Sequence, residues 1–117
     1  MLRLCLLSAI VATLAACVTP PKNLYAWGDY EQLIFTNHAT PGAGDPQSQV
    51  ATLEKDYQLA RASDLRLPPG WHAHLGYLYF QLGKPDQAQQ EFTTEKVQFP
   101  ESAAFMDRLI ARLKKSS

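Results

Sequence analysis

Prolines and glycines divide this chain into short segments, and that punctuation limits what the chain can fold into. The breaks fall at 41–44, 68–70, 83–85 and Pro100. Proline is tolerated in the first turn of a helix but not in its interior, and glycine commonly ends a helix. Between the breaks, no segment alternates apolar and polar residues for long enough to predict a sheet. The sequence therefore predicts an all-α fold built from short helices.

Apolar side chains at three- and four-residue spacing predict about five amphipathic helices, and the short connections make neighbouring helices antiparallel. We expect these helices at 23–38, from Pro46, at 69–82, from Pro85 and after Ser102. Asp45 is the expected N-cap of the second helix, and Ser102 that of the fifth. The side chains expected to face inward are Trp27, Tyr30, Val50, Leu53, Tyr57, Ala60, Leu75, Leu78, Tyr79, Leu82, Ala88, Phe92, Phe105, Met106, Leu109, Ile110 and Leu113.

The N-terminus has the features of a bacterial lipoprotein signal peptide. Arg3 precedes the uncharged apolar stretch 4–13, which is too short to span a membrane. Residues 14–17 (LAAC) match the bacterial lipobox at every position, with small residues before the cut and a thiol that accepts diacylglycerol. The alternatives are an ordinary secretory signal with an incidental cysteine and a membrane-spanning anchor. We expect a signal peptide at 1–16 and fatty chains, palmitate among them, on Cys17.

Cleavage would leave 101 of the 117 residues, as a lipidated tether at 17–22 and one helical domain at 23–117. Cys5 would be lost with the signal, so the mature chain would have no free thiol. The tether reaches no more than about 20 Å at about 3.3 Å per residue, so the domain would stay close to the bilayer. Val18 follows the cysteine where an aspartate tends to retain lipoproteins in the inner membrane. The sequence therefore predicts the periplasmic face of the outer membrane.

Charge and motif content argue against several function classes. The mature chain would carry 10 basic and 11 acidic residues without a basic stripe, which disfavours nucleic-acid binding. His72 and His74 would point about 200° apart on a helix, so they would not share a metal ion, and His38 is distant. The sequence has no nucleophile elbow, zinc-protease motif or phosphate loop. We therefore expect no enzyme, no metal site and no cofactor.

Residues 69–102 span 34 residues and resemble a tetratricopeptide repeat, which is a hairpin of two helices. The positions that match the repeat pattern are Leu75, Gly76, Tyr79, Ala88, Phe92 and Pro100. Gly76 and Ala88 are small where the two helices would cross, so the backbones can approach closely. The resemblance implies one clear repeat followed by a helix that caps the array.

Some positions depart from a regular array of such repeats. Glu95 stands where a small alanine is usual, and Trp71 lies one residue before the aromatic position that His72 holds. These departures weaken stacking onto a further full repeat. A degenerate repeat before the clear one is left open, with Trp27-Gly28 imitating a Leu-Gly pair at a spacing too long by about a dozen residues. Its second helix would carry Leu53, Tyr57 and Ala60.

The chain as a whole resembles a family of small, uncharacterised bacterial lipoproteins of about this length. The resemblance covers nearly all of the chain and rests on residues 25–31 (YAWGDYE), 69–76 (PGWHAHLG) and 99–102 (FPES). Members of that family are usually encoded beside two other lipoproteins, one of which is similar to the curli-secretion channel protein. The resemblance implies a cell-envelope assembly and implies no chemistry.

The tetratricopeptide resemblance also implies a concave groove, lined by the first helix of the hairpin at Gly70, Ala73, Tyr77, Phe80 and Gln81. Tyr77 and Phe80 lie away from the apolar stripe of that helix, and an apolar pair on an open face indicates a partner surface. The alternative is that the first or last helix folds over them. We expect partner binding at Ala73, Tyr77, Phe80 and Gln81.

Together these features predict a non-enzymatic, membrane-anchored adaptor in an outer-membrane lipoprotein or secretion-type complex. Its partners would be other envelope lipoproteins, including one similar to the curli-secretion channel. The alternatives are a periplasmic activator or scaffold of cell-wall synthesis, and a carrier of a small ligand or lipid.

Overall fold

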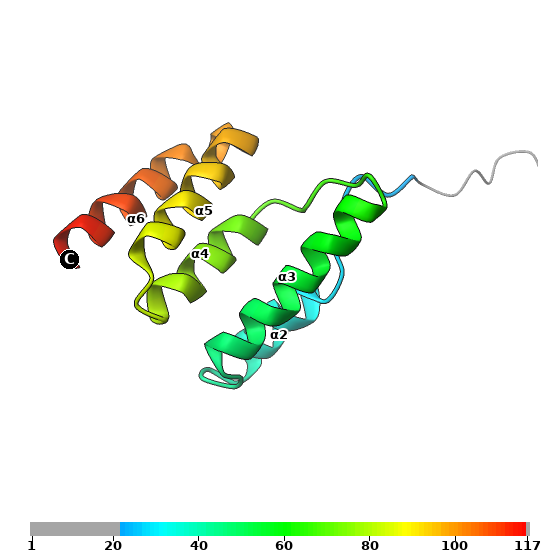
Figure 1. Ribbon diagram of the computed structural model, residues 1–117, viewed down its shortest axis with the longest axis horizontal. Coiled ribbons are helices and arrows are strands. Elements are labelled where there is room, and N and C mark those ends of the chain that lie inside the picture. The colour runs from blue at the N-terminus through cyan, green and yellow to red at the C-terminus, as the bar shows by residue number, and fades with distance from the viewer. Residues whose placement is uncertain (1–21, 117) are drawn as a thin grey trace, which may run out of the picture.

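The computed structural model describes residues 22–116, which form five α-helices and one 3-10 turn (Figure 1). These elements are α2 (Tyr30–Ala39), α3 (Pro46–Ala62), α4 (Trp71–Gln81), α5 (Pro85–Gln98), η2 (Pro100–Ser102) and α6 (Ala103–Ser116). Within this part of the chain there is no β-strand, and none of the helices is long and apolar enough to cross a membrane. The predicted all-α fold is confirmed.

Each helix packs against the next one along the chain. Figure 1 shows α2 and α3 as one hairpin, and α4, α5 and α6 lying side by side, with the irregular segment 63–70 joining the two parts. One hydrophobic core runs through both parts, from Tyr30 on α2 to Leu113 on α6.

Helix boundaries from α3 onward follow the punctuation of the sequence. The Asp45 carboxylate accepts a hydrogen bond from the Ser48 N–H at 2.9 Å, and Pro46 occupies the first turn, so the predicted cap of α3 is confirmed. Gly83 adopts a φ of +70°, and its N–H donates to the Phe80 carbonyl at 3.0 Å. This left-handed turn ends α4 and leads to Pro85, which opens α5.

The first predicted helix is wrong over its first seven residues, because α2 begins at Tyr30 and not at residue 23. The Ala26 N–H donates to the Arg66 carbonyl at 2.8 Å, and the Asp29 N–H donates to the Asp56 carboxylate at 2.8 Å. These distant partners replace the hydrogen bonds of a helix. Gly28, with a φ of +50°, turns the chain there.

This correction changes the interpretation of Trp27. Trp27 and Gly28 precede α2, so they are not a Leu-Gly pair inside a helix, and that part of the degenerate repeat is wrong. Trp27 is 43% exposed, which contradicts the expectation that it lies in the core, whereas Tyr30 is buried as expected. Leu53 and Ala60, on the second helix of the same hairpin, are also buried.

The crossing of α4 and α5 is as close as the sequence predicts. A Cβ on Gly76 would lie 2.7 Å from the Phe92 ring and 3.1 Å from the Ala88 carbonyl oxygen. Both Ala88 and Phe92 are fully buried. Glycine is therefore required at this position for the two helices to approach.

Glu95 replaces the small residue of the repeat pattern and has a structural role. Its buried carboxylate accepts hydrogen bonds from the Gly70 N–H at 2.7 Å and the Ala73 N–H at 3.4 Å. A carboxylate at this place accepts hydrogen bonds from N–H groups that the first turn of α4 leaves unpaired. The positive N-terminal end of the α4 dipole also stabilises its negative charge. Burial, together with the charge of Glu95, raises the pKa of Tyr30 to about 12.

Other predicted positions also differ in the structure. Phe105 is 53% exposed, which contradicts its expected place in the core, whereas the next residue of α6, Met106, is buried as expected. Tyr57 is 37% exposed, although one side of its ring stacks on the buried Trp71 and Arg61 lies over the ring at 5.9 Å from its centroid. Ser102 directly precedes α6, at the position predicted for its N-cap, and its hydroxyl donates to the Phe99 carbonyl at 2.8 Å.

Candidate functional site

Residues of α2, α4 and α6 line three neighbouring cavities. The first, of about 390 Å³, lies along α2, the second, of about 480 Å³, between α2 and α4, and the third, of about 310 Å³, between α4 and α6. Ile34 and His38 line both the first and the second cavity, and Tyr77 lines both the second and the third. Because adjoining cavities share walls, we call them together the α2–α4–α6 groove.

The structure brings three of the predicted partner-binding residues to this groove. Tyr77 and Phe80 are 48% and 41% exposed, so neither α2 nor α6 folds over them. Gln81 lines the second cavity, and its amide donates to the Tyr77 hydroxyl at 3.3 Å. Ala73 lines none of the three cavities and packs against the core, and Gly70 is the N-cap of α4.

The groove also contains residues that the sequence did not single out. Leu109 packs against the core as the sequence predicts, and it also lines the third cavity beside Phe80. His74 lines the second cavity, and its Nε2 is shielded from solvent with no hydrogen-bond partner among the described residues. Burial lowers the pKa of His74, which favours the neutral form of its ring. His72 lines a different groove, described below, so the two histidines are separated.

Charge is distributed unevenly along the α2–α4–α6 groove. No aspartate or glutamate is among the described residues that line the second and third cavities. Arg112 and Lys115 line the third cavity, at the α6 end, and Glu31 lines the first, on α2. Two cationic side chains therefore line the cavity beside α6, and one carboxylate lines the cavity along α2.

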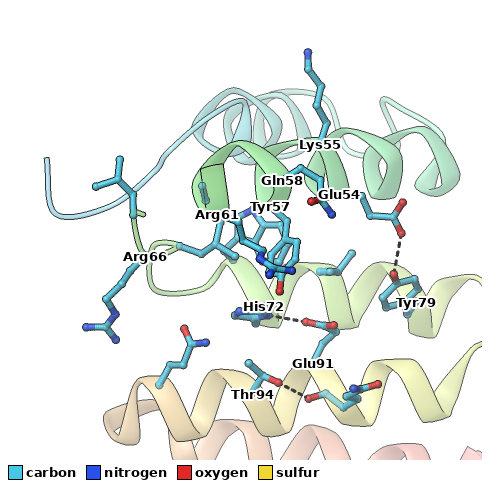
Figure 2. Close-up of a pocket in the computed structure, with 17 residues that line it drawn as sticks. Glu54, Lys55, Tyr57, Gln58, Arg61, Arg66, His72, Tyr79, Glu91 and Thr94 are labelled. Carbon is cyan, nitrogen blue, oxygen red and sulfur yellow. Dashed lines mark hydrogen bonds and ion pairs between the residues drawn. The ribbon is translucent and has the colours of Figure 1, made fainter. Parts of the chain in front are cut away.

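A second groove, of about 1010 Å³, lies between α3 and α5, with α4 as its floor (Figure 2). The buried side chains of Trp71, His72 and Leu75 form that floor. Figure 2 shows Lys55 on α3 pointing away from the space enclosed by the helices. The irregular segment 63–70 contributes one end of this groove, and we call it the α3–α5 groove.

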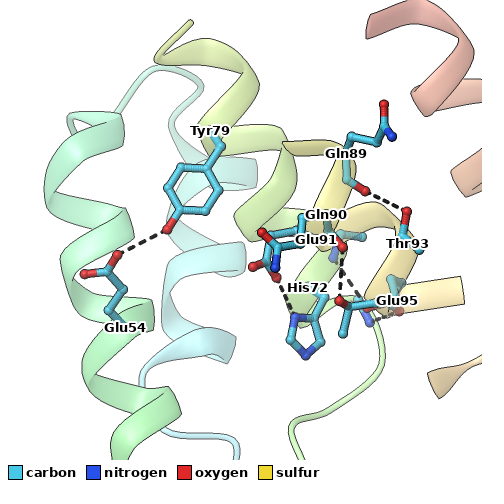
Figure 3. A network of polar contacts seen from close by, with 11 residues as sticks. Glu54, His72, Tyr79, Gln89, Gln90, Glu91, Thr93 and Glu95 are labelled. Atoms are coloured by element: carbon cyan, nitrogen blue, oxygen red, sulfur yellow. Dashed lines mark hydrogen bonds and ion pairs between the residues drawn. The ribbon is translucent and has the colours of Figure 1, made fainter. Parts of the chain in front are cut away.

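Polar contacts in the α3–α5 groove join neighbouring helices (Figure 3). The Tyr79 hydroxyl on α4 donates to Glu54 on α3 at 3.2 Å, and His72 Nδ1 lies 2.6 Å from Glu91 Oε2 on α5. Burial, and next the hydrogen bond to Glu54, raise the pKa of Tyr79 to about 12. Both carboxylates are thus engaged in contacts that join neighbouring helices across this groove.

Cys17, the predicted lipid attachment site, lies outside the described residues, as do the predicted signal peptide and most of the tether. Residues 24–109 match a family described as a domain of unknown function (DUF4810). The match begins ahead of α2 and ends within α6, so it covers the hairpin, the repeat-like pair and the first half of the last helix. Neither a curated protein nor a solved structure matches the chain.

Proposed function

Because the chain belongs to the family described as a domain of unknown function (DUF4810), we propose its function from the geometry of its own groove. It is a non-enzymatic adaptor that binds another envelope protein in the α2–α4–α6 groove while lipid on Cys17 holds it at the periplasmic face of the outer membrane. The observation that carries this proposal is the joint exposure of Tyr77 and Phe80 on one face of α4.

Two half-exposed aromatic side chains are well suited to anchor a partner, since large rings bury much apolar area and lose little rotamer entropy. The helix that presents them is held rigidly, by the Gly76 crossing on one side and by Glu95 at its start. A preorganised surface loses little further conformational freedom on binding.

The lipobox and the short tether support a role beside the membrane. Two proteins anchored in one membrane meet at a raised effective concentration. Even a partner with low affinity for the groove would therefore occupy it. The family resemblance favours another lipoprotein, similar to the curli-secretion channel, as the partner. A tether of about 20 Å disfavours the alternative, an activator of cell-wall synthesis at the inner membrane.

The test is a pull-down from detergent-solubilised envelope with the lipidated protein, comparing Tyr77→Ala plus Phe80→Ala with a matched pair, Tyr57→Ala plus Phe105→Ala. The control pair removes the same residue types from exposed positions outside the groove. We expect one envelope lipoprotein to be retained by the wild type and the control pair and lost with the groove pair. Capture of none, or equal capture by all three, would refute the adaptor.

Lipid attachment is tested separately by mass spectrometry of the protein from native cells. We expect an acylated N-terminal Cys17 after loss of residues 1–16, and no acylation or membrane retention in Cys17→Ala. An unmodified chain in the membrane fraction would contradict the anchor.

A further inference from the structure

We propose that the surface around Trp27 and Phe35 rests on the lipid bilayer in which Cys17 is anchored, at the level of the headgroups. We call these two side chains, together with the cavity that they both line, the Trp27 face. The inference rests on the proposed lipid anchor and goes beyond the adaptor function, because it assigns a membrane contact that the adaptor does not need.

The Trp27 face is apolar and open. Trp27 and Phe35 are 43% and 68% exposed, and both line the first cavity, of about 390 Å³. Ile34 and Tyr30 add apolar and aromatic wall to the same cavity. A single exposed apolar side chain is common on protein surfaces, but two large ones around one hollow form a surface from which an apolar partner favourably displaces water.

The tether brings this face within reach of the bilayer. Trp27 follows Lys22, the first described residue, by five positions, so the two lie at most about 18 Å apart. Leu24, between them, is 75% exposed and adds apolar surface beside the tether. Phe105 on α6 is also exposed, but Figure 1 shows α6 at the end of the molecule opposite residue 22. Lipid on Cys17 therefore holds the Trp27 face, and not α6, near the membrane.

Neighbouring aromatic rings hold Trp27 in place. Tyr25 meets its ring edge-on with the centroids 6.3 Å apart, and Tyr30 stacks on it at 6.5 Å with the planes 19° apart. Tryptophan and tyrosine favour the interface between membrane and water, because each ring joins an apolar body to a polar N–H or O–H group. A ring that is already fixed loses little further freedom when it meets lipid.

Charged neighbours limit the depth of the contact. Glu31 lines the same cavity, and Asp29 is exposed two positions after Trp27. A carboxylate is costly inside the hydrocarbon, so the face would lie among the headgroups. Lys22 carries the opposite charge at the tether end, so the contact is carried by apolar burial and not by attraction to anionic lipid.

Membrane contact at this face leaves the partner site free. Tyr77 and Phe80 do not line the first cavity. The second and third cavities of the α2–α4–α6 groove therefore stay open to a protein anchored in the same bilayer.

The two tryptophans of the chain make the contact measurable. Trp71 is 1% exposed, so lipid does not reach it, and the Trp27→Phe variant supplies its background emission. The lipidated mature protein is reconstituted into phosphatidylcholine vesicles whose acyl chains carry bromine, a quencher of tryptophan fluorescence, near the headgroup or near the chain end. We expect bromine near the headgroup to lower the Trp27 emission about twofold, and bromine near the chain end to lower it little, since such rings sit at headgroup level.

A matched pair of substitutions ties this quenching to the face. Phe35→Ser should weaken the quenching of Trp27, whereas Phe105→Ser, which makes the same change on α6, should leave it as in the wild type. Both positions are exposed, so both variants should fold, and circular dichroism checks this. High salt, or phosphatidylglycerol in the vesicles, should change the quenching little, because screening acts on charges and not on apolar burial.

Unquenched Trp27 in the lipidated protein, quenching that Phe35→Ser does not weaken, or quenching that high salt removes would overturn the inference. A dimer in sedimentation that Phe35→Ser dissolves would also overturn it, because a second copy would then cover the face. Cys17 without fatty chains would remove the anchor and this inference together. If Trp27 stays unquenched while the pull-down captures a partner through Tyr77 and Phe80, the adaptor function stands and only the membrane contact is wrong.

Discussion

The α4–α6 part and the α2–α3 hairpin are both helical, but different contacts hold their helices together. In the α4–α6 part, Phe92 fills the space beside Gly76, and the helices approach as closely as a missing Cβ allows. The α4–α6 part also buries the polar side chains of His72 and Glu95, but the two helices of the α2–α3 hairpin approach each other over a much smaller area, so its buried polar contacts matter more. Asp56 accepts the Asp29 N–H at 2.8 Å, and Gln49, also buried, accepts a hydrogen bond from the Asn37 amide at 2.9 Å.

This difference shows why one part follows a repeat pattern and the other does not. Close apolar packing depends on residue size at fixed spacing, so it leaves a periodic signal in the sequence. Polar contacts between distant residues depend on the geometry of each contact, so they leave no periodic signal in the sequence. The candidate groove lies where the two parts meet, since Tyr77 lines cavities against both α2 and α6.

The largest expected effect breaks the packing of the α4–α6 part. Phe92→Ala should lower the free energy of unfolding by about 4 kcal/mol, because it opens a cavity at the helix crossing. Phe105→Ala, at a half-exposed position of α6, should change it by less than about 1 kcal/mol. Chemical denaturation followed by circular dichroism measures both. Similar values for the two variants would show that the crossing is not the main source of stability there.

A smaller effect is expected from the polar link of the α2–α3 hairpin. Asp56→Ala should lower the free energy of unfolding by about 2 kcal/mol, since it leaves the Asp29 N–H without its charged acceptor. Hydrogen exchange should quicken at 22–39 and stay slow in α4 and α5. Asp107→Ala, which removes an exposed ion pair with Lys96, should cost less than about 1 kcal/mol. Faster exchange throughout the chain would contradict the idea of separately held parts.

The smallest change in the free energy of unfolding at neutral pH is expected for Tyr30→Phe, at most about 1 kcal/mol. The folded pKa of Tyr30 and that of Tyr79 are each raised from 10 to about 12, so the folded state keeps protons that the unfolded state loses between these values. The stability contributed by the neutral hydroxyls is therefore present below pH 10 and lost as the pH rises toward 12.

Urea unfolding at pH 7 and pH 11 checks this alkaline loss. Tyr30→Phe should lose less stability than the wild type between these pH values, and Tyr77→Phe, at an exposed position in the groove, should behave like the wild type. If Tyr30→Phe loses as much stability as the wild type between pH 7 and pH 11, the burial of Tyr30 does not affect the titration of its hydroxyl.

Much of the fold and part of the site could be predicted from the sequence. The caps at Asp45 and Gly83 and the close approach at Gly76 follow from local rules of residue size and backbone freedom. Helical spacing also placed Tyr77 and Phe80 away from the core. Ala73 shares the same helix, but its contacts with the core are a tertiary property, and the spacing did not reveal them.

The sequence by itself determined the helices, their order and which residue sizes allow two of them to cross, because these depend on neighbours three or four positions away. Only the tertiary structure decided where α2 begins and how the neighbouring cavities of the groove form. At Ala26 and Asp29 the backbone N–H groups bond to residues more than twenty positions away, and these bonds replace a helix that local spacing favours. The groove likewise needs side chains from α2, α4 and α6 at once, and their meeting depends on packing between helices.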